Sequence, residues 1–185
     1  EPGQAVGIYM PMIPEIEAAL LGIARLGAMA VPLFSGFAAH AIATRLNDAR
    51  AVAVLTADAT PRRGKPVWME ATLAEALTEV PSVHTVFSLR RFGGAVADPA
   101  RDLDWAETVG HASPDFAAVP VKAEDTFLIA YTSGTTGRPK GVVHTHLGVQ
   151  AKATADFLLD SPLIDSRYQR RVPDLDAYMG DRTGS

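Results

Sequence analysis

Short apolar runs alternate with segments of helical periodicity over the first 89 residues, and this alternation limits the folds open to the chain. Residues 51–55 form a short continuous apolar run, which is typical of a buried strand, and residues 5–10, 29–34 and 83–89 also predict extended segments. Between them lie segments with helical spacing, which start at Pro14, near Ala38 and at a capping-box pair, Thr72 and Glu75. This order predicts an α/β fold: a mostly parallel sheet with right-handed crossovers and flanking helices.

Two features modify this simple pattern. Pro32 has no N–H to donate, so it predicts that its run lies at a sheet edge or ends there. Turn-forming pairs of Gly, Pro, Asp and Ser predict an irregular connection over residues 90–125, with one short helix around Trp105.

The remainder of the chain returns to regular structure before its end. Residues 126–131 predict a buried strand, Val142 and Val143 a return strand, and residues 147–159 a helix. We therefore expect residues 1–160 to form one partial domain. The charged residues 161–185 predict a divergent, disordered tail.

The segment from Tyr131 to Gly141 combines hydroxyl side chains, glycines and two cations directly after an apolar run. Glycines let successive N–H groups point at one anion, hydroxyls add neutral donors, and Lys140 adds a mobile positive charge. The segment therefore predicts a cradle for phosphate oxygens. It is not a Walker A motif, because Gly141 stands where Ser or Thr is required after the lysine. The alternative is a Ser/Thr/Gly surface turn between two strands.

Composition excludes several classes of function. The 185 residues carry a net charge of −4, so no basic face for nucleic acid is expected. The most apolar region, residues 16–37, is interrupted by Glu17, Arg25 and Pro32, so no membrane span is expected. The chain has no cysteine, which removes thiolate chemistry and fits a cytoplasmic location.

The segment YTSGTTGRPKGVVHTH at residues 131–146 resembles the phosphate-loop signature of the adenylate-forming superfamily. Upstream, the segments IYMPMIPE, ARLGA, FSGFAA, RLNDA and LTAD resemble the short-chain branch typified by acetyl-CoA synthetase. The resemblance covers residues 2–159 and implies part of the N-terminal domain of such an enzyme.

The resemblance implies a role for the loop in gripping the β- and γ-phosphates of ATP while a carboxylate attacks the α-phosphate. Pyrophosphate leaves, so negative charge grows where the loop donors point, and Mg²⁺ shares that work. The implied phosphate-binding residues are Thr132, Ser133, Gly134, Thr135, Thr136, Gly137 and Lys140.

The resemblance also implies contacts with coenzyme A, made by a Phe-Gly-Gly turn and two arginines. The matching residues are Phe34, Gly36, Arg62, Arg63 and Lys65. Ser35 replaces the first glycine of the turn, and Lys65 replaces the second arginine with a point charge that lacks bidentate geometry. The alternative for residues 62–65 is a solvated basic turn.

The resemblance implies an AMP-forming ligase that joins a small carboxylic acid to CoA, and also that this chain holds only part of it. The chain lacks an initiator Met and begins on a strand-like run. No counterparts are found for the segments that grip adenine and ribose or for the C-terminal catalytic lysine. We therefore expect a fragment without a complete catalytic set that is inactive alone. The alternatives are an adenylation domain with another acceptor, or a non-catalytic phosphate-binding module.

Two other clusters are weaker candidates. His144 and His146 would share a strand face, but two histidines are weak evidence for a metal, so we expect none. Asp102 and Asp104 lie in the irregular connection, where solvated side chains are expected.

Overall fold

The computed structural model describes residues 1–94, 98–132 and 139–160. Its main feature is a seven-stranded sheet with the order β7-β6-β3-β1-β2-β8-β9. Every neighbouring pair is parallel except β8 and β9. The predicted α/β fold with a mostly parallel sheet and flanking helices is confirmed.

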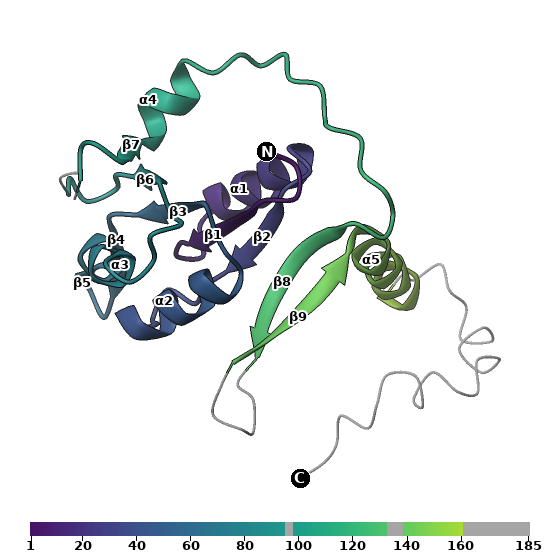
Figure 1. Cartoon of the computed structure of the whole chain (residues 1–185), viewed down its shortest axis with the longest axis horizontal. Helices are drawn as coiled ribbons and strands as arrows, with labels where there is room; N and C mark the ends of the chain where they lie inside the picture. Colours follow the sequence, from purple (N-terminus) through teal and green to yellow (C-terminus); the bar gives the residue numbers. More distant parts are fainter. Residues whose placement is uncertain (95–97, 133–138, 161–185) are drawn as a thin grey trace, which may run out of the picture. The chain divides into compact units, whose positions relative to one another are not determined.

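The centre of the sheet comes from the first 57 residues, where strands and helices alternate as predicted (Figure 1). The elements are β1 (Ala5–Tyr9), α1 (Pro14–Arg25), β2 (Met29–Pro32), α2 (Ala39–Asp48) and β3 (Ala53–Ala57). Pro32 ends β2, so its missing N–H falls at a strand end while β2 itself lies inside the sheet, between β1 and β8.

Helix α1 covers one face of the sheet. Pro14 stands in its first turn with Glu15 and Glu17, and Arg25 stands in its last, an arrangement that favours the helix dipole. Its buried residues Ala19 and Ile23 pack with Ile8 and Ala30 in one apolar cluster. Gly27, with a φ of 68°, ends the helix in the left-handed conformation.

Helices α2 and α3 (Met69–Leu77) cover the opposite face. Ile42 and Leu46 of α2 and Leu73 of α3 share a cluster with Val31 and Val54 of the strands. Ala30 and Val31 are consecutive in β2, so their side chains point to opposite faces of the sheet. Each therefore belongs to a different apolar cluster.

A two-stranded antiparallel hairpin, β4 (Ala59–Arg62) and β5 (Lys65–Trp68), stands apart from the main sheet and was not predicted. It ends directly at α3, which begins at Met69 with Trp68 as its N-cap. The predicted start of this helix at a Thr72–Glu75 capping box is therefore wrong, because both residues lie inside the helix. The inward positions predicted for Leu73, Ala76 and Leu77 are confirmed, as all three are buried.

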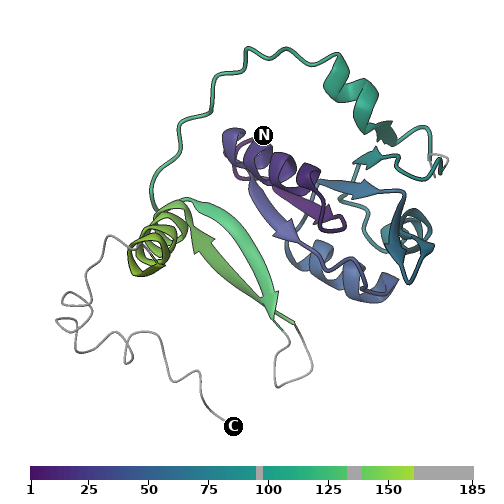
Figure 2. The same cartoon turned by 180° about the vertical axis from the view of Figure 1, so that it is seen from behind.

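The segment from 90 to 125 is more ordered than its turn signals indicate. After β6 (Thr85–Leu89), β7 (Asp102–Asp104) adds a parallel edge strand, and α4 (Trp105–Gly110) is the predicted short helix. Residues 111–125 contain no helix or strand (Figure 2). The connection runs past the end of α1, where Val119 N donates to Arg25 O at 2.8 Å.

The last strands form a hairpin, β8 (Thr126–Thr132) and β9 (Lys140–Thr145), joined to β2 through the pairing of Leu128 with Ala30. Helix α5 (His146–Asp160) follows. Residues Glu1–His146 form one compact unit, and the helix from Leu147 onward belongs to a second. The predicted tail, residues 161–185, lies outside the described residues.

Candidate functional site

The predicted phosphate loop connects the two strands of the β8–β9 hairpin. Thr132 ends β8, Lys140 begins β9, and the two are direct partners in the antiparallel register. Both side chains are exposed. Ser133, Gly134, Thr135, Thr136 and Gly137 lie outside the described residues. The hairpin therefore brings together the hydroxyl and the cation at the two ends of the loop.

Tyr131, the residue that precedes this loop, anchors β8 to α2. Its hydroxyl donates to Asp48 Oδ2 at 2.5 Å, and the guanidinium of Arg45 lies 5.9 Å from its ring centre. Burial and the Asp48 carboxylate raise the pKa of Tyr131 well above its ordinary value, although Arg45 opposes this. The phenol therefore stays protonated and keeps its role as donor.

A hollow of about 400 Å³ opens at the end of β1, between the turn that precedes α2 and the β4–β5 hairpin. Three of the predicted CoA residues, Phe34, Gly36 and Arg62, line it together. They come from two segments of the chain, since Arg62 follows Gly36 by 26 positions in the sequence. Tyr9 forms part of the wall, and its hydroxyl donates to Ser35 O at 3.3 Å.

Gly36 allows the Phe34 ring to fold back over the turn. A Cβ at position 36 would lie 2.6 Å from Cε1 of Phe34, so any larger residue must displace the ring. The Phe34 ring also meets the Phe37 ring edge to face, with 5.6 Å between centres, and Arg45 stacks over Phe37 at 4.2 Å. The turn is thus supported from α2.

The other two predicted CoA residues, Arg63 and Lys65, are exposed and do not line the hollow. Arg63 and Gly64 form the two-residue turn of the hairpin with φ values of 51° and 77°, and Arg62 pairs with Lys65 across it. Two positive φ values are typical of a type I′ turn, whose twist suits a hairpin. Within the described part of the chain, none of the three cations is paired with a carboxylate.

Sequence reasoning gave no role to two residues in this region. Trp68 lines the hollow, and Asp58 O accepts from Met69 N, the residue after Trp68, at 2.9 Å. Asp58 is fully buried and accepts three backbone hydrogen bonds, from Ala59 N (2.7 Å), Phe92 N (2.7 Å) and Gly94 N (3.2 Å). Burial acts to raise the pKa of Asp58, but these N–H donors outweigh it and hold that pKa below its ordinary value.

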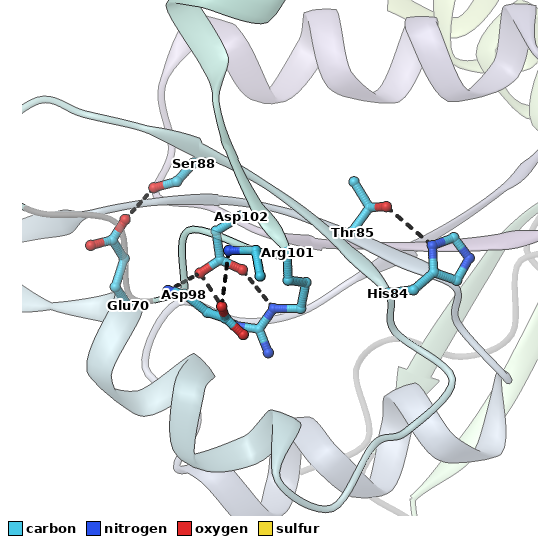
Figure 3. Close-up of polar contacts among 8 residues, drawn as sticks. Glu70, His84, Thr85, Ser88, Asp98, Arg101 and Asp102 are labelled. Atoms are coloured by element: carbon cyan, nitrogen blue, oxygen red, sulfur yellow. Dashed lines mark hydrogen bonds and ion pairs between the residues drawn. The ribbon is translucent and has the colours of Figure 1, made fainter.

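A second polar cluster joins α3 and β6 to the start of β7 (Figure 3). Ser88 Oγ donates to Glu70, and Arg101 Nε pairs with Asp102 Oδ1 at 2.5 Å. Burial raises the pKa of Glu70, opposed by the Ser88 hydrogen bond. The enclosed space here is about 10 Å³, close to the minimum for one water molecule. We therefore assign this cluster a structural role.

The acidic residues and histidines that were weaker candidates do not lie as the sequence predicted. Asp102 is buried and ion-paired, not solvated, because β7 places it against β6. Asp104 caps α4 by accepting from Glu107 N at 3.0 Å and pairs with Arg90. His144 lies on β9 whereas His146 begins α5, so they do not share a strand face. Among the described residues, no three His, Asp or Glu side chains are grouped to hold a metal.

Comparisons with known proteins show which family the chain resembles. A family model described as AMP-binding enzyme matches residues 1–170. The chain is 44% identical to the acetyl-coenzyme A synthetase of Rhodopirellula baltica and 42% identical to that of Rubrobacter xylanophilus, each over 161 residues. These alignments cover 85% of this chain but 24% and 25% of the relatives.

A solved structure gives the same picture. The acetoacetyl-CoA synthetase from Streptomyces lividans is similar with a TM-score of 0.75 and 30% identity, covering 82% of this chain and 23% of that one. The chain therefore spans about a quarter of the length of the relatives it matches. In the part that the structure describes, no helix combines the length and the apolar character that crossing a bilayer requires.

Proposed function

Because the chain belongs to the AMP-binding enzyme family, we propose that it forms part of an AMP-forming short-chain carboxylic acid–CoA ligase. In this reaction a carboxylate oxygen attacks the α-phosphate of MgATP, and pyrophosphate leaves. The CoA thiol then attacks the acyl carbon of the adenylate, loses its proton and displaces AMP. The acid, MgATP and CoA are thus the proposed small-molecule partners.

The observation that carries the proposal is the convergence of Phe34, Gly36 and Arg62 on one hollow. A cavity of about 400 Å³ falls within the range of about 300–1,000 Å³ that is usual for small-molecule sites. Arg62 stands at its edge with Arg63 and Lys65 beside it, and a cluster of cations favours the phosphates of CoA.

The β8–β9 hairpin supports the ATP half of the proposal. Thr132 and Lys140 face each other across the register, so a hydroxyl and an ammonium are available on both sides of one anion. Lys140 would neutralise charge that develops on the leaving pyrophosphate, and Thr132 would donate to a phosphate oxygen. Mg²⁺ enters with the nucleotide, as part of the MgATP substrate.

Binding of MgATP to the full chain tests this half. We expect MgATP to shift the amide resonances of residues 131–141, and Lys140→Met to weaken binding roughly 10- to 150-fold, the loss of one charged hydrogen bond. Lys122→Met, at an exposed lysine in the connection, is the matched control. Unchanged resonances in residues 131–141 would remove the ligase assignment.

Binding of CoA separates the proposal from its alternatives. An adenylation module with another acceptor predicts MgATP binding without CoA, and a non-catalytic phosphate module predicts that acetate and CoA leave the spectrum unchanged. We expect CoA to shift the amides of Phe34, Gly36 and Arg62. Loss of that shift with retained MgATP binding would favour another acceptor.

The activity of the 185 residues alone is a separate part of the proposal. Since the chain spans about a quarter of its relatives, we propose that it does not complete acyl-CoA synthesis by itself. Thiol consumption in the presence of acetate, MgATP and CoA is the measurement, and steady turnover would contradict this. A cytoplasmic location and the division into residues 1–160 and a tail of residues 161–185 also belong to the proposal.

A further inference from the structure

Two aromatic side chains from separate segments line the hollow and stay open to solvent. Phe34 is 67% exposed and Trp68 is 47% exposed, and both share the hollow with Arg62. Large exposed aromatic side chains beside a guanidinium suit a purine nucleotide, because the rings stack on the base and the cation contacts a phosphate. Sequence reasoning assigned Phe34 and Arg62 to CoA but gave Trp68 no role.

The indole of Trp68 packs against Gly94. Gly94 lies so close that a Cβ there would be 3.1 Å from Cζ3 of Trp68. Gly94 N donates to the Asp58 carboxylate, and Asp58 O accepts from Met69 N at 2.9 Å, next to Trp68 in the chain. Asp58 thus fixes both the backbone behind the ring and the backbone that carries it. A ring fixed in this way loses little freedom when a ligand binds.

We infer that Trp68 stacks on the adenine of coenzyme A, with Phe34 as the second aromatic surface and Arg62 on a phosphate. The inference rests on the proposed function, since it assigns CoA to the hollow. Trp68 becomes a specificity-determining residue: it favours a thiol carrier that bears a purine over one that carries phosphopantetheine alone.

Fluorescence of the full chain provides the test. The chain has two tryptophans, so Trp105→Phe leaves Trp68 as the only reporter. Trp105 is on α4 and packs against the α1 cluster, which includes none of the residues that line the hollow. CoA, adenosine 3′,5′-bisphosphate, 4′-phosphopantetheine and ATP are then titrated separately.

We expect saturable quenching by CoA and by adenosine 3′,5′-bisphosphate, and none by phosphopantetheine. Trp68→Leu should weaken CoA binding about 5- to 150-fold, the usual effect of losing one base–aromatic stack. Trp68→Phe, which retains a ring, should weaken it much less. The quenching measurement leaves Trp68 unchanged, so the inference is testable even if Trp68→Leu does not fold.

The outcomes separate the inference from the proposed function. If CoA binds and Arg62→Met weakens it, but neither quenching nor Trp68→Leu has an effect, the inference fails and the CoA site stands. If ATP quenches Trp68 as strongly as CoA does, the adenine belongs to the other substrate and the inference fails. If CoA does not bind at all, both the inference and the CoA half of the proposed function fail.

Discussion

Asp58 shows how a single buried carboxylate can hold together several segments of the chain. Its side chain collects N–H groups from Ala59, Phe92 and Gly94, and its carbonyl accepts from Met69. The hairpin, the start of α3 and the loop after β6 therefore meet at one residue. Removing its charge should disturb all three.

We expect Asp58→Asn to lower the free energy of unfolding at pH 7 by about 1.5–3 kcal/mol, because the amide replaces one of the two accepting oxygens with an NH2 group that faces N–H donors. Urea denaturation measures this. Asp115→Asn, at an exposed aspartate in the connection, is the control and should change little. An equal loss in both variants would contradict the role given to Asp58.

The free energy of unfolding should depend on pH because Asp58 ionises. The pKa of Asp58 is lower in the folded chain than its unfolded value of about 3.9. Its contribution is therefore fully present above about pH 4 and is lost as the pH falls toward the folded pKa. The difference in stability between the parent chain and Asp58→Asn should accordingly shrink in urea titrations below about pH 4.

The sequence predicted some of these residues and not others for a physical reason. Phe34, Gly36 and Arg62 lie in recognisable local segments, and the fold brings them to one hollow. Phe92 and Gly94, which donate to Asp58, follow it by 34 and 36 positions in the chain. Trp68 packs against Gly94, which is also distant in sequence. Such long-range partners are set by tertiary packing, which no local pattern records.

At the scale of elements, the β4–β5 hairpin escaped prediction because Pro61 and Pro66 interrupt both of its strands. The two prolines pair with each other, and the hairpin stands outside the main sheet, where missing N–H donors are tolerated. The local signal that was available is the Arg63-Gly64 turn between two short extended segments.

Gly64→Ala tests the conformation of that turn. Gly64 has a φ of 77° and no atom within 4 Å of the place where a Cβ would lie, so the substitution meets only backbone strain. We expect a loss of about 1–2 kcal/mol in the free energy of unfolding. Gly22→Ala, in the interior of α1 and equally uncrowded, should instead stabilise the chain by about 0.5–1 kcal/mol. Equal signs for the two variants would rule out the proposed turn geometry.

Tyr131 links two elements, since its hydroxyl joins the end of β8 to α2. We expect Tyr131→Phe to cost about 0.5–1.5 kcal/mol and to speed amide hydrogen exchange in residues 126–132. Asp48→Asn keeps an oxygen acceptor and should have a smaller effect. Unchanged exchange in β8 after Tyr131→Phe would show that the hydroxyl does not hold the strand.

At the scale of the whole unit Glu1–His146, close packing of the sheet against α2 depends on a small residue in the central strand. A Cβ on Gly7 would lie 2.7 Å from Leu46 Cδ2 and 3.2 Å from Val54 Cγ2. The helix and the sheet therefore approach each other over a position with no side chain, inside the larger apolar cluster.

We expect Gly7→Ala to lower the free energy of unfolding by about 1–3 kcal/mol, the usual cost of overpacking a core. Urea denaturation with an unchanged slope would confirm a native-state effect. Gly110→Ala, at the end of α4 with open space around it, is the control. A neutral Gly7→Ala would mean that α2 lies further from the sheet.

The alternation of strands and helices was enough to predict the class of the fold, but not the order β7-β6-β3-β1-β2-β8-β9. Alternation fixes the crossovers, whereas the edge on which each strand joins depends on which helix faces remain to be covered. The short strand β7, only three residues long, carries too little apolar character to be recognised before it pairs with β6.

The pairing of Ala30 with Leu128 has a consequence for how the chain acquires its structure on the ribosome. Strands β3, β1 and β2 are neighbours in the sheet, and all three lie within residues 1–57. The ribosome therefore synthesises the middle of the sheet well before it reaches β8. Until then the edge of β2 that pairs with β8 is unpaired. Pairing two strands that are so far apart in the sequence is slow.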